Sequence, residues 1–283
     1  MPRQIPGLFL SPHSVIGKAL QSLHFCVPKW KDMKNRLIYF LVLSGAMILL
    51  SCKKDKVEAI QFTVYKAAGD ISPKLNEFRS SLGQLNTTPG AAGGRREINW
   101  EGIPDNLLNK PLAKDFFNPV GDGASPSLQR GLVYDDGEFQ ASANFFAHLN
   151  SEASSEFKAF SGNKVFANVS DLEWPVGFQV AGQSTPASVK AFGIVFADID
   201  AENSVSLEFF EGEKSLGKFF APAQNADSKF SFLGIAFQNR QVTKVKVHHQ
   251  GRLTAGGKDI SQGGTEDLIV IDDLIYSEPI RQE

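Results

Sequence analysis

The feature that most constrains the fold is a series of short apolar or alternating segments between residues 60 and 276, separated from one another by turn-forming residues. Residues 60–65 and 242–247 alternate apolar and polar side chains, whereas residues 190–200 indicate a buried strand that runs into an acidic loop. The 23 Phe and 25 Gly, against three Met, favour strands and turns over helices. These observations predict a mainly β fold, a two-sheet jelly-roll-like sandwich with a Phe-rich core.

Individual segments predict how the strands face and pair. Val245 and Val247 should point to one side of their strand and the intervening lysines to the other, which predicts a solvent-facing outer surface. Three residues of the buried strand should share one face: Phe192, Ile194 and Phe196. Residues 205–210 and 216–220 should form a hairpin, and residues 131–134 and 139–143 should be two strands around a turn at residues 135–137.

One segment has the pattern of a short amphipathic helix. Ser72 suits the N-cap, Pro73 the first helical position and Gly83 the stop. The residues that share its apolar face are Leu75, Phe78 and Leu82. We expect this helix to cover an open end or edge of a sheet, followed by a flexible Gly-rich loop over residues 86–94.

Residues 33–51 have the layout of a signal peptide. Met33, Lys34 and Arg36 provide a positively charged start, and residues 37–50 form an apolar run of the length of a secretory h-region. A membrane-spanning helix needs roughly 20 apolar residues, so this run is short for one. A retained membrane anchor is the alternative interpretation.

The end of this run, Leu49-Leu50-Ser51-Cys52, resembles the lipobox of bacterial lipoproteins. In that family small residues precede a cysteine that becomes the lipidated first residue of the mature protein. The resemblance implies a signal peptide over 33–51, lipidation at Cys52 and a tether over 52–59. It places the protein in the cell envelope, anchored to a membrane, which we expect to be the outer membrane. Two or more acyl chains hold a protein stably, since each buried methylene contributes about 0.8 kcal/mol.

Residues 1–32 fit this layout poorly, because they place the signal far from the N-terminus. We expect Met33 to be the true start and residues 1–32 to be a mis-assigned extension; the alternative is an overlong n-region. After the tether, residues 60–94 should hold a strand, the helix and the Gly-rich loop, and residues 95–283 the β-sandwich.

Cysteine content and charge exclude several protein classes. The chain has two Cys, Cys26 and Cys52; the first falls in the expected leader and the second is the expected lipid site, so we expect neither a disulfide nor a cysteine metal site in the mature protein. The formal net charge of −2 gives no large basic field, and we therefore expect no nucleic-acid partner.

The most distinctive motif is Gly94-Arg-Arg-Glu-Ile-Asn-Trp-Glu-Gly-Ile-Pro-Asp105. Its alternation places Ile98 and Trp100 on one strand face before a turn. The motif resembles Gly-Arg-Arg-Glu-Ile-Asn-Trp-Asp-Gly-Val-Pro-Asp, a signature in a large, poorly characterised family of bacterial exported proteins, some with C-terminal sorting tails. This chain has Glu101 and Ile103 where the pattern has Asp and Val. It ends at Glu283 without such a tail, which fits anchoring at Cys52.

A second, shorter resemblance concerns residues 271–276, which are similar to the closing strand of galactose-binding-like jelly rolls in carbohydrate-binding modules. There an acidic residue of the closing strand often helps to hold a structural calcium ion. The resemblance implies a calcium site that joins Glu101 or Asp105 to Asp272. The alternative is that these carboxylates are solvated or paired with a basic residue. Other acidic sets are Asp198 with Asp200, Asp272 with Asp273, and Glu97 with Glu101.

Three further residues are candidates for ligand binding. Arg95 and Arg96 could clamp a carboxylate or an anionic sugar, or pair with acidic neighbours and fix the Gly-rich loop. Trp174 falls in a predicted turn and is the better candidate for an exposed sugar-stacking platform. Trp100 could also stack on a sugar, but its alternating strand favours a place in the core.

No motif indicates catalysis. The chain has no nucleophile elbow, zinc-protease helix, P-loop or dinucleotide fingerprint, His148 is isolated, and the adjacent His248 and His249 should face opposite ways. We therefore expect a noncatalytic, lipid-anchored envelope protein whose sandwich binds a glycan or another surface component such as a protein. A structural or assembly role without a small-ligand site is the alternative, and a carbohydrate-active enzyme with paired carboxylates is a third hypothesis.

Overall fold

The computed structural model describes residues 58–224 and 228–282. The expected extension, signal peptide and lipidation site at Cys52 lie outside the described residues. Within the described part the chain is mainly β, with fourteen strands and one α-helix, and every strand pair is antiparallel. None of the described helices is long and apolar enough to cross a membrane.

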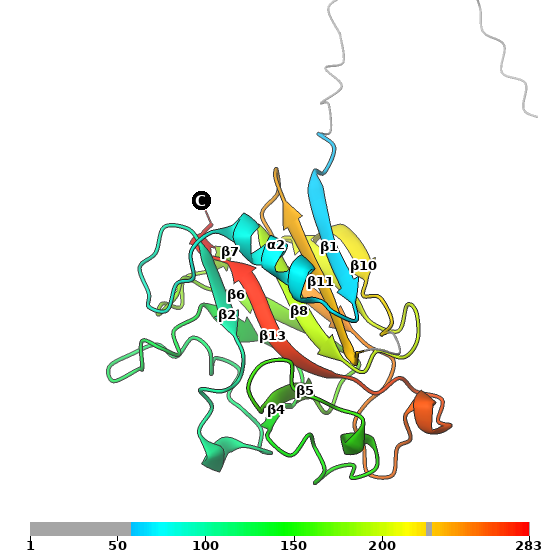
Figure 1. The fold of residues 1–283 in the computed structure, drawn as a ribbon. Helices are drawn as coiled ribbons and strands as arrows, with labels where there is room; N and C mark the ends of the chain where they lie inside the picture. The colour runs from blue at the N-terminus through cyan, green and yellow to red at the C-terminus, as the bar shows by residue number, and fades with distance from the viewer. Residues whose placement is uncertain (1–57, 225–227, 283) are drawn as a thin grey trace, which may run out of the picture. The chain divides into compact units, whose positions relative to one another are not determined.

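Two sheets form the body of the fold (Figure 1). The larger has the order β1 (Phe62–Ala68), β11 (Phe230–Phe237), β8 (Ala191–Ala197), β13 (Val270–Ser277), β5 (Val165–Asn168) and β4 (Phe139–Ser142), with β2 (Arg95–Ile98) paired to β13. The second has the order β10 (Lys214–Phe220), β9 (Ser206–Glu211), β12 (Lys244–His248), β6 (Glu173–Phe178) and β3 (Leu132–Tyr134). A two-stranded ribbon joins β14 (Ile280–Arg281) to β7 (Ala187–Ser188). Short 3-10 helices lie at Asp105–Leu107, Ala153–Ser155 and Ile260–Gln262.

The main core lies between the two sheets. Phe192, Ile194 and Phe196 point into it from β8, as the alternation predicts, and meet Val245 and Val247 of β12. On β12 the intervening lysines are only half-buried, so the predicted solvent face of this strand is confirmed. The predicted two-sheet sandwich with aromatic filling is therefore the fold of the described chain.

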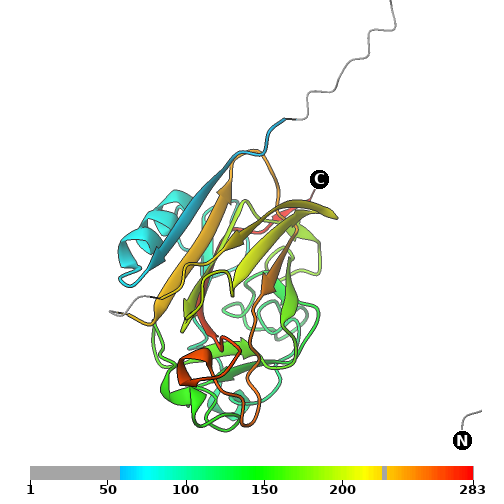
Figure 2. The same cartoon turned by 90° about the vertical axis from the view of Figure 1, so that its right-hand side faces the viewer.

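A second apolar cluster lies on the outer face of the larger sheet, under α2 (Ser72–Leu82). Figure 2 shows α2 outside the β1–β11 pair, on the side away from the second sheet. The ring of Phe78 sits above two facing glycines, Gly193 and Gly234; a Cβ at either position would come within 3.0 or 3.1 Å of that ring. Helix α2 can approach the sheet closely because these two positions lack a Cβ. Since α2 covers this side of the sheet and the main core covers the other, β8 is buried on both faces.

The start of α2 differs from the prediction by one residue. Ile71 occupies the N-cap position and Ser72 is already helical, because the Asp70 carboxylate accepts the Ser72 N–H at 3.1 Å in place of a serine cap. Pro73 lies in the first turn and Gly83, with φ of 88°, ends the helix, as expected.

The predicted hairpin is confirmed by the pairing of β9 with β10. The strands on either side of the turn at residues 135–137 behave differently: β3 pairs with β6 in the smaller sheet, and β4 pairs with β5 in the larger one. This turn therefore crosses from one sheet to the other. Tyr134 and Phe139 stack across the core at 4.2 Å between ring centroids, so both strands bury an aromatic in the same interior.

Candidate functional site

The two arginines of the signature are used inside the fold. Arg96 is fully buried, and its guanidinium donates from Nε and Nη2 to the two carboxylate oxygens of Glu278, both at 2.7 Å. Its Nη2 also donates to the carbonyl of Thr88 in the Gly-rich loop at 3.0 Å. Arg95 donates to Glu97 at 2.6 Å and to the carbonyl of Gly83. Arg95 and Arg96 were expected either to clamp an anionic ligand or to pair with acidic neighbours and fix the Gly-rich loop. Their contacts match the second alternative.

The signature tryptophan is a core residue, as expected, but it lies beyond the end of β2 and not on the predicted strand. Trp100 follows β2 with a left-handed backbone, φ of 67°. Its indole stacks on Phe166 with ring centroids 4.0 Å apart and planes 2° from parallel, and its Nε1 donates to the carbonyl of Asp272. The signature thus ties β2 to β13 and β5, and its residues serve the architecture of the sandwich.

The prediction that Trp174 is an exposed platform is wrong. Trp174 has no exposed surface and packs against Phe139 at 5.2 Å. The segment that was expected to be a turn is strand β6, on which Trp174, Val176 and Phe178 alternate into the sandwich. Trp174 therefore cannot serve as a sugar-binding surface.

The three carboxylates of the expected calcium site do not converge. Glu101 accepts the N–H groups of Asn163 and Lys164 at 2.9 and 2.8 Å. Asp105 is 90 % exposed and lies 3.3 Å from the Lys164 ammonium. Asp272 accepts the N–H groups of Phe160 and Ser161. The backbone N–H groups at the two ends of the 160–164 loop therefore donate to Asp272 and Glu101, and these two carboxylates hold the loop.

Asp272 lies in a bulge of β13, between Ile271, opposite Phe196, and Leu274, opposite Ile194. Burial, and then hydrogen bonding and repulsion with Asp273, raise the pKa of Asp272 to about 8. The neighbouring Asp273 is paired with Arg79 at 3.0 Å. Residues of the 160–164 loop donate hydrogen bonds to both Asp272 and Asp273, so the two aspartates have a structural role in the sheet.

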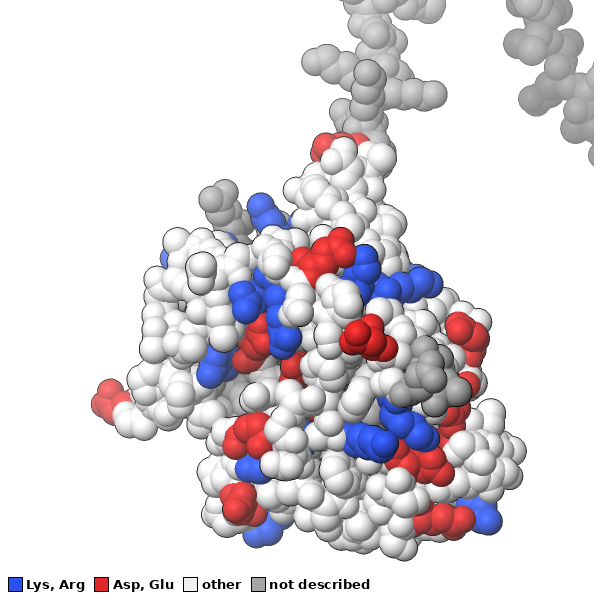
Figure 3. All heavy atoms as spheres, in the orientation of Figure 1, with Lys and Arg blue, Asp and Glu red and all other residues white. Residues whose placement is uncertain are grey.

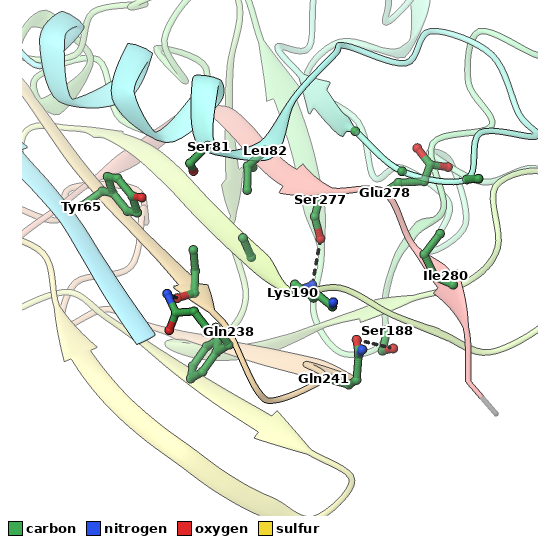
Figure 4. A pocket seen from close by; sticks show the side chains of 16 residues that line it. Tyr65, Ser81, Leu82, Ser188, Lys190, Gln238, Gln241, Ser277, Glu278 and Ile280 are labelled. Atoms are coloured by element: carbon green, nitrogen blue, oxygen red, sulfur yellow. Dashed lines mark hydrogen bonds between the residues drawn. The ribbon is translucent and has the colours of Figure 1, made fainter. Parts of the chain in front are cut away.

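A hollow of about 540 Å³ lies on the outer face of the larger sheet, between the end of α2, the Gly-rich loop and the β14–β7 ribbon. This volume is within the range of small-molecule sites, about 300–1,000 Å³. Figure 4 shows Ser81 and Leu82 on one side of it, Tyr65 and Gln238 on a second, Glu278 and Ile280 opposite them, and Ser188 and Gln241 at the base. No sequence pattern pointed to it, because its lining comes from segments more than 200 residues apart.

Most of the polar lining is uncharged. Hydroxyl and amide groups come from Tyr65, Ser81, Ser188, Gln238, Gln241 and Ser277. Ser188 donates to Gln241 Oε1 at 3.2 Å, which leaves the Gln241 amide nitrogen available. Ser277 accepts the backbone N–H of Lys190 at 2.8 Å, and the Lys190 ammonium forms no ion pair with any described residue. The hollow can therefore offer both donors and acceptors together with one positive charge.

Among the described residues that line the hollow, Glu278 is the one with a carboxylate. Its oxygens accept hydrogen bonds from Arg96 and Asn86. Around the hollow the charges are mixed: Figure 3 shows Lys and Arg interspersed with Asp and Glu over this face of the molecule. The arrangement suits a polar ligand held by hydrogen bonds. It has no free pair of carboxylates for glycoside hydrolysis.

Comparisons with known proteins add no family. No protein-family model matches the chain. None of the curated proteins matches it either.

Proposed function

We propose that this protein is a noncatalytic, lipid-anchored protein of the bacterial cell envelope, and that it binds a glycan or another polar surface component in the hollow beside α2. The observation that carries the proposal is the composition of that hollow, about 540 Å³ lined by hydroxyls, amides, the edge of Tyr65 and one unpaired ammonium. Concave sites with a few convergent polar groups are the usual form of ligand sites.

The chemistry of the lining favours a sugar over an apolar ligand. Each sugar hydroxyl both donates and accepts: the Gln241 amide nitrogen can donate to one and Gln238 Oε1 can accept from one, whereas the Gln238 amide nitrogen already donates to Thr63 and Ala236. Lys190 adds a charged donor, and hydrogen bonds to charged groups contribute about 1.5–3 kcal/mol. A glycan that carries a carboxylate or another acidic group would therefore be preferred over a neutral one of the same size.

The proposed anchor lies close to the sandwich along the chain. Phe62, the first residue of β1, lies ten positions after Cys52 (62 − 52 = 10). A fully extended chain of that length spans at most about 35 Å. Lipidation at Cys52 would thus keep the sandwich near the membrane surface, where envelope glycans are concentrated.

The experiment is a glycan array with the purified protein and two variants of the hollow, Lys190→Ala and Gln241→Ala. We expect reproducible binding by the unaltered protein, weakened roughly tenfold or more by either substitution. Lys66→Ala is the matched control, because Lys66 is an exposed lysine of β1 that does not line the hollow. An array on which the unaltered protein binds nothing would count against the proposal and favour the alternative role.

That alternative is a structural or assembly role, and one observation favours it. The edge strands β1 and β10 lie at corresponding ends of the two sheets and expose Phe62, Val64 and Phe220, each about 40 % accessible. Phe62 and Phe219 join the two edges at 5.0 Å between ring centroids. Unpaired strand edges with exposed apolar residues are surfaces on which another protein can pair. A photo-crosslinker at Phe62 would capture one defined partner in cells, whereas one at Leu172, also exposed, would not.

A further inference from the structure

A group of carboxylates lies at another place on the sandwich, away from the hollow. Asp198 and Asp200 follow β8, and Asp259 lies in the segment that leads to β13. One carboxylate oxygen of each lies within 4.8 Å of those of the other two. Because β8 and β13 are neighbours in the larger sheet, their flanking loops meet here.

Asp198 is the innermost member and has an oxygen without a partner. Its residue has no exposed surface. Oδ1 accepts from the Lys229 ammonium at 2.8 Å and from Gln224 Nε2 at 3.1 Å. Oδ2 is buried and accepts no hydrogen bond, and the same holds for Oδ2 of Asp200. Buried carboxylate oxygens normally have partners, so two unpartnered oxygens in one cluster indicate a missing positive group.

The charges around the cluster do not balance. Asp267 accepts the backbone N–H groups of Asp200 and Ala201 at 3.1 and 3.0 Å, which places a fourth aspartate beside the other three. Lys229 is the cation paired with Asp198, and it is shared with Glu156 at 2.8 Å. Five carboxylates therefore surround one ammonium among the described residues, and burial makes that excess unfavourable.

We propose that Asp198, Asp200 and Asp259 bind one divalent cation of the calcium type, with the free Oδ2 of Asp198 as its innermost ligand. Calcium–oxygen distances are about 2.3–2.6 Å, so two oxygens on opposite sides of an ion are roughly 4.6–5.2 Å apart. The three ligand oxygens all lie within 4.8 Å of one another, so one ion of this size can reach all three. Lys229 keeps Oδ1 of Asp198 and leaves Oδ2 to the ion.

The donor set selects the class of cation. The cluster contains carboxylates and no His or Cys, which favours hard cations with oxygen ligands over zinc or copper. Irregular loops supply the aspartates, and calcium accepts the variable geometry of such loops more readily than magnesium does. Carbonyl groups of the loops and water would complete six to eight ligands. The ion would tie the loop after β8 to the loop before β13, a role separate from ligand binding in the hollow.

A proton is the competing explanation for the unpartnered oxygens. Burial raises the pKa of Asp198 to about 7, against the lowering effect of Lys229. Burial and the contact with Asp259 raise the pKa of Asp200 as well. One shared proton would relieve the same repulsion without any metal, and this alternative predicts a different response to calcium and to pH.

The test is calorimetric titration of the chelator-treated, purified protein with calcium chloride at a pH above 8, together with thermal unfolding in the same solutions. We expect one bound ion per chain with a dissociation constant below roughly 1 mM, the weak limit of extracellular calcium modules. At a calcium concentration of 100 times that constant, Tm should rise by roughly 5 to 10 °C. Magnesium chloride at equal concentration should give a smaller shift.

Asp200→Asn and Asp259→Asn should abolish the calcium-dependent shift, and Asp122→Asn, an exposed aspartate outside the cluster, should retain it. The titration of the unaltered protein decides the matter even if a cluster variant does not fold. Absence of both heat and Tm shift with calcium up to roughly 1 mM would overturn the proposal. The free energy of unfolding could instead rise as the pH falls through about 7, by the same amount with calcium and with chelator. That result would show that a proton, and not a cation, neutralises the cluster.

Discussion

Arg96 and Glu278, 182 residues apart in the sequence, form a buried bidentate ion pair with both hydrogen bonds at 2.7 Å. The pair joins the signature strand β2 to the segment after β13, and Glu278 also accepts from Asn86 of the Gly-rich loop at 2.8 Å. Through Glu278 the same pair contributes to one wall of the hollow. The most distinctive motif of the sequence therefore supports the candidate site through the partner of Arg96, and the motif residue that lines the hollow is Gly94.

Glu278→Ala should lower the free energy of unfolding by about 3–5 kcal/mol, because it leaves the Arg96 guanidinium buried without a counter-charge. Urea denaturation at neutral pH measures the loss. Lys74→Ala is the matched control, since Lys74 pairs with Glu77 on the exposed face of α2 and should change stability by less than about 0.5 kcal/mol. Equal effects from the two substitutions would contradict the buried pair.

Trp174→Ala should destabilise the protein by about 3–5 kcal/mol, because it empties a large, fully buried site next to Phe139. Leu172→Ala, two residues earlier and 44 % exposed, should have little effect. Chemical denaturation of both variants makes the comparison. A Trp174→Ala variant as stable as the unaltered protein would refute the core position of this side chain.

Asp272→Asn should stabilise the protein above neutral pH. The pKa of Asp272 is about 8 in the folded protein against an ordinary value near 4, so the folded state holds a proton that the unfolded state has released. For the unaltered protein this contribution makes stability fall as pH rises from about 4 to about 8. An asparagine needs no proton, can accept from Phe160 and Ser161 through its oxygen, and can donate to Asp273.

The stability difference between Asp272→Asn and the unaltered protein should therefore be near zero at pH 4 and grow to about 1–3 kcal/mol in favour of the variant at pH 8. Urea unfolding across that range measures it, with Asp122→Asn as the exposed control. A difference that is independent of pH, or that grows toward acid, would show that Asp272 is ionised in the folded protein.

Cys52→Ser should release the protein from the membrane fraction, because it removes the proposed attachment of the acyl chains, each methylene of which contributes about 0.8 kcal/mol. Cell fractionation and the mass of the N-terminal peptide provide the measurement. Cys26→Ser is the matched control and should leave localisation unchanged, since Cys26 precedes the proposed signal peptide. Retention of the Cys52→Ser protein in the membrane would instead support a spanning anchor over residues 37–50.

The sequence by itself determined the local elements of the sandwich. Alternation in residues 242–247 and the placement of Phe192, Ile194 and Phe196 were sufficient to predict which side chains are buried, because the period of a strand assigns its faces directly. The α2 segment was also predictable from its apolar spacing and its terminal Pro and Gly. Trp100 is buried as expected, but its left-handed backbone lies beyond the end of β2, so strand alternation is not the reason.

The tertiary structure decided what depends on distant segments. Trp174 could not be distinguished from an exposed residue, because its burial comes from pairing of β6 with β3 and β12. Neither the hollow nor the meeting of Asp259 with Asp198 and Asp200 has a local signal, since each gathers residues from loops far apart in the chain. Strand periodicity specifies the face on which a side chain lies, whereas the order of strands in the sheets determines which distant side chains it meets.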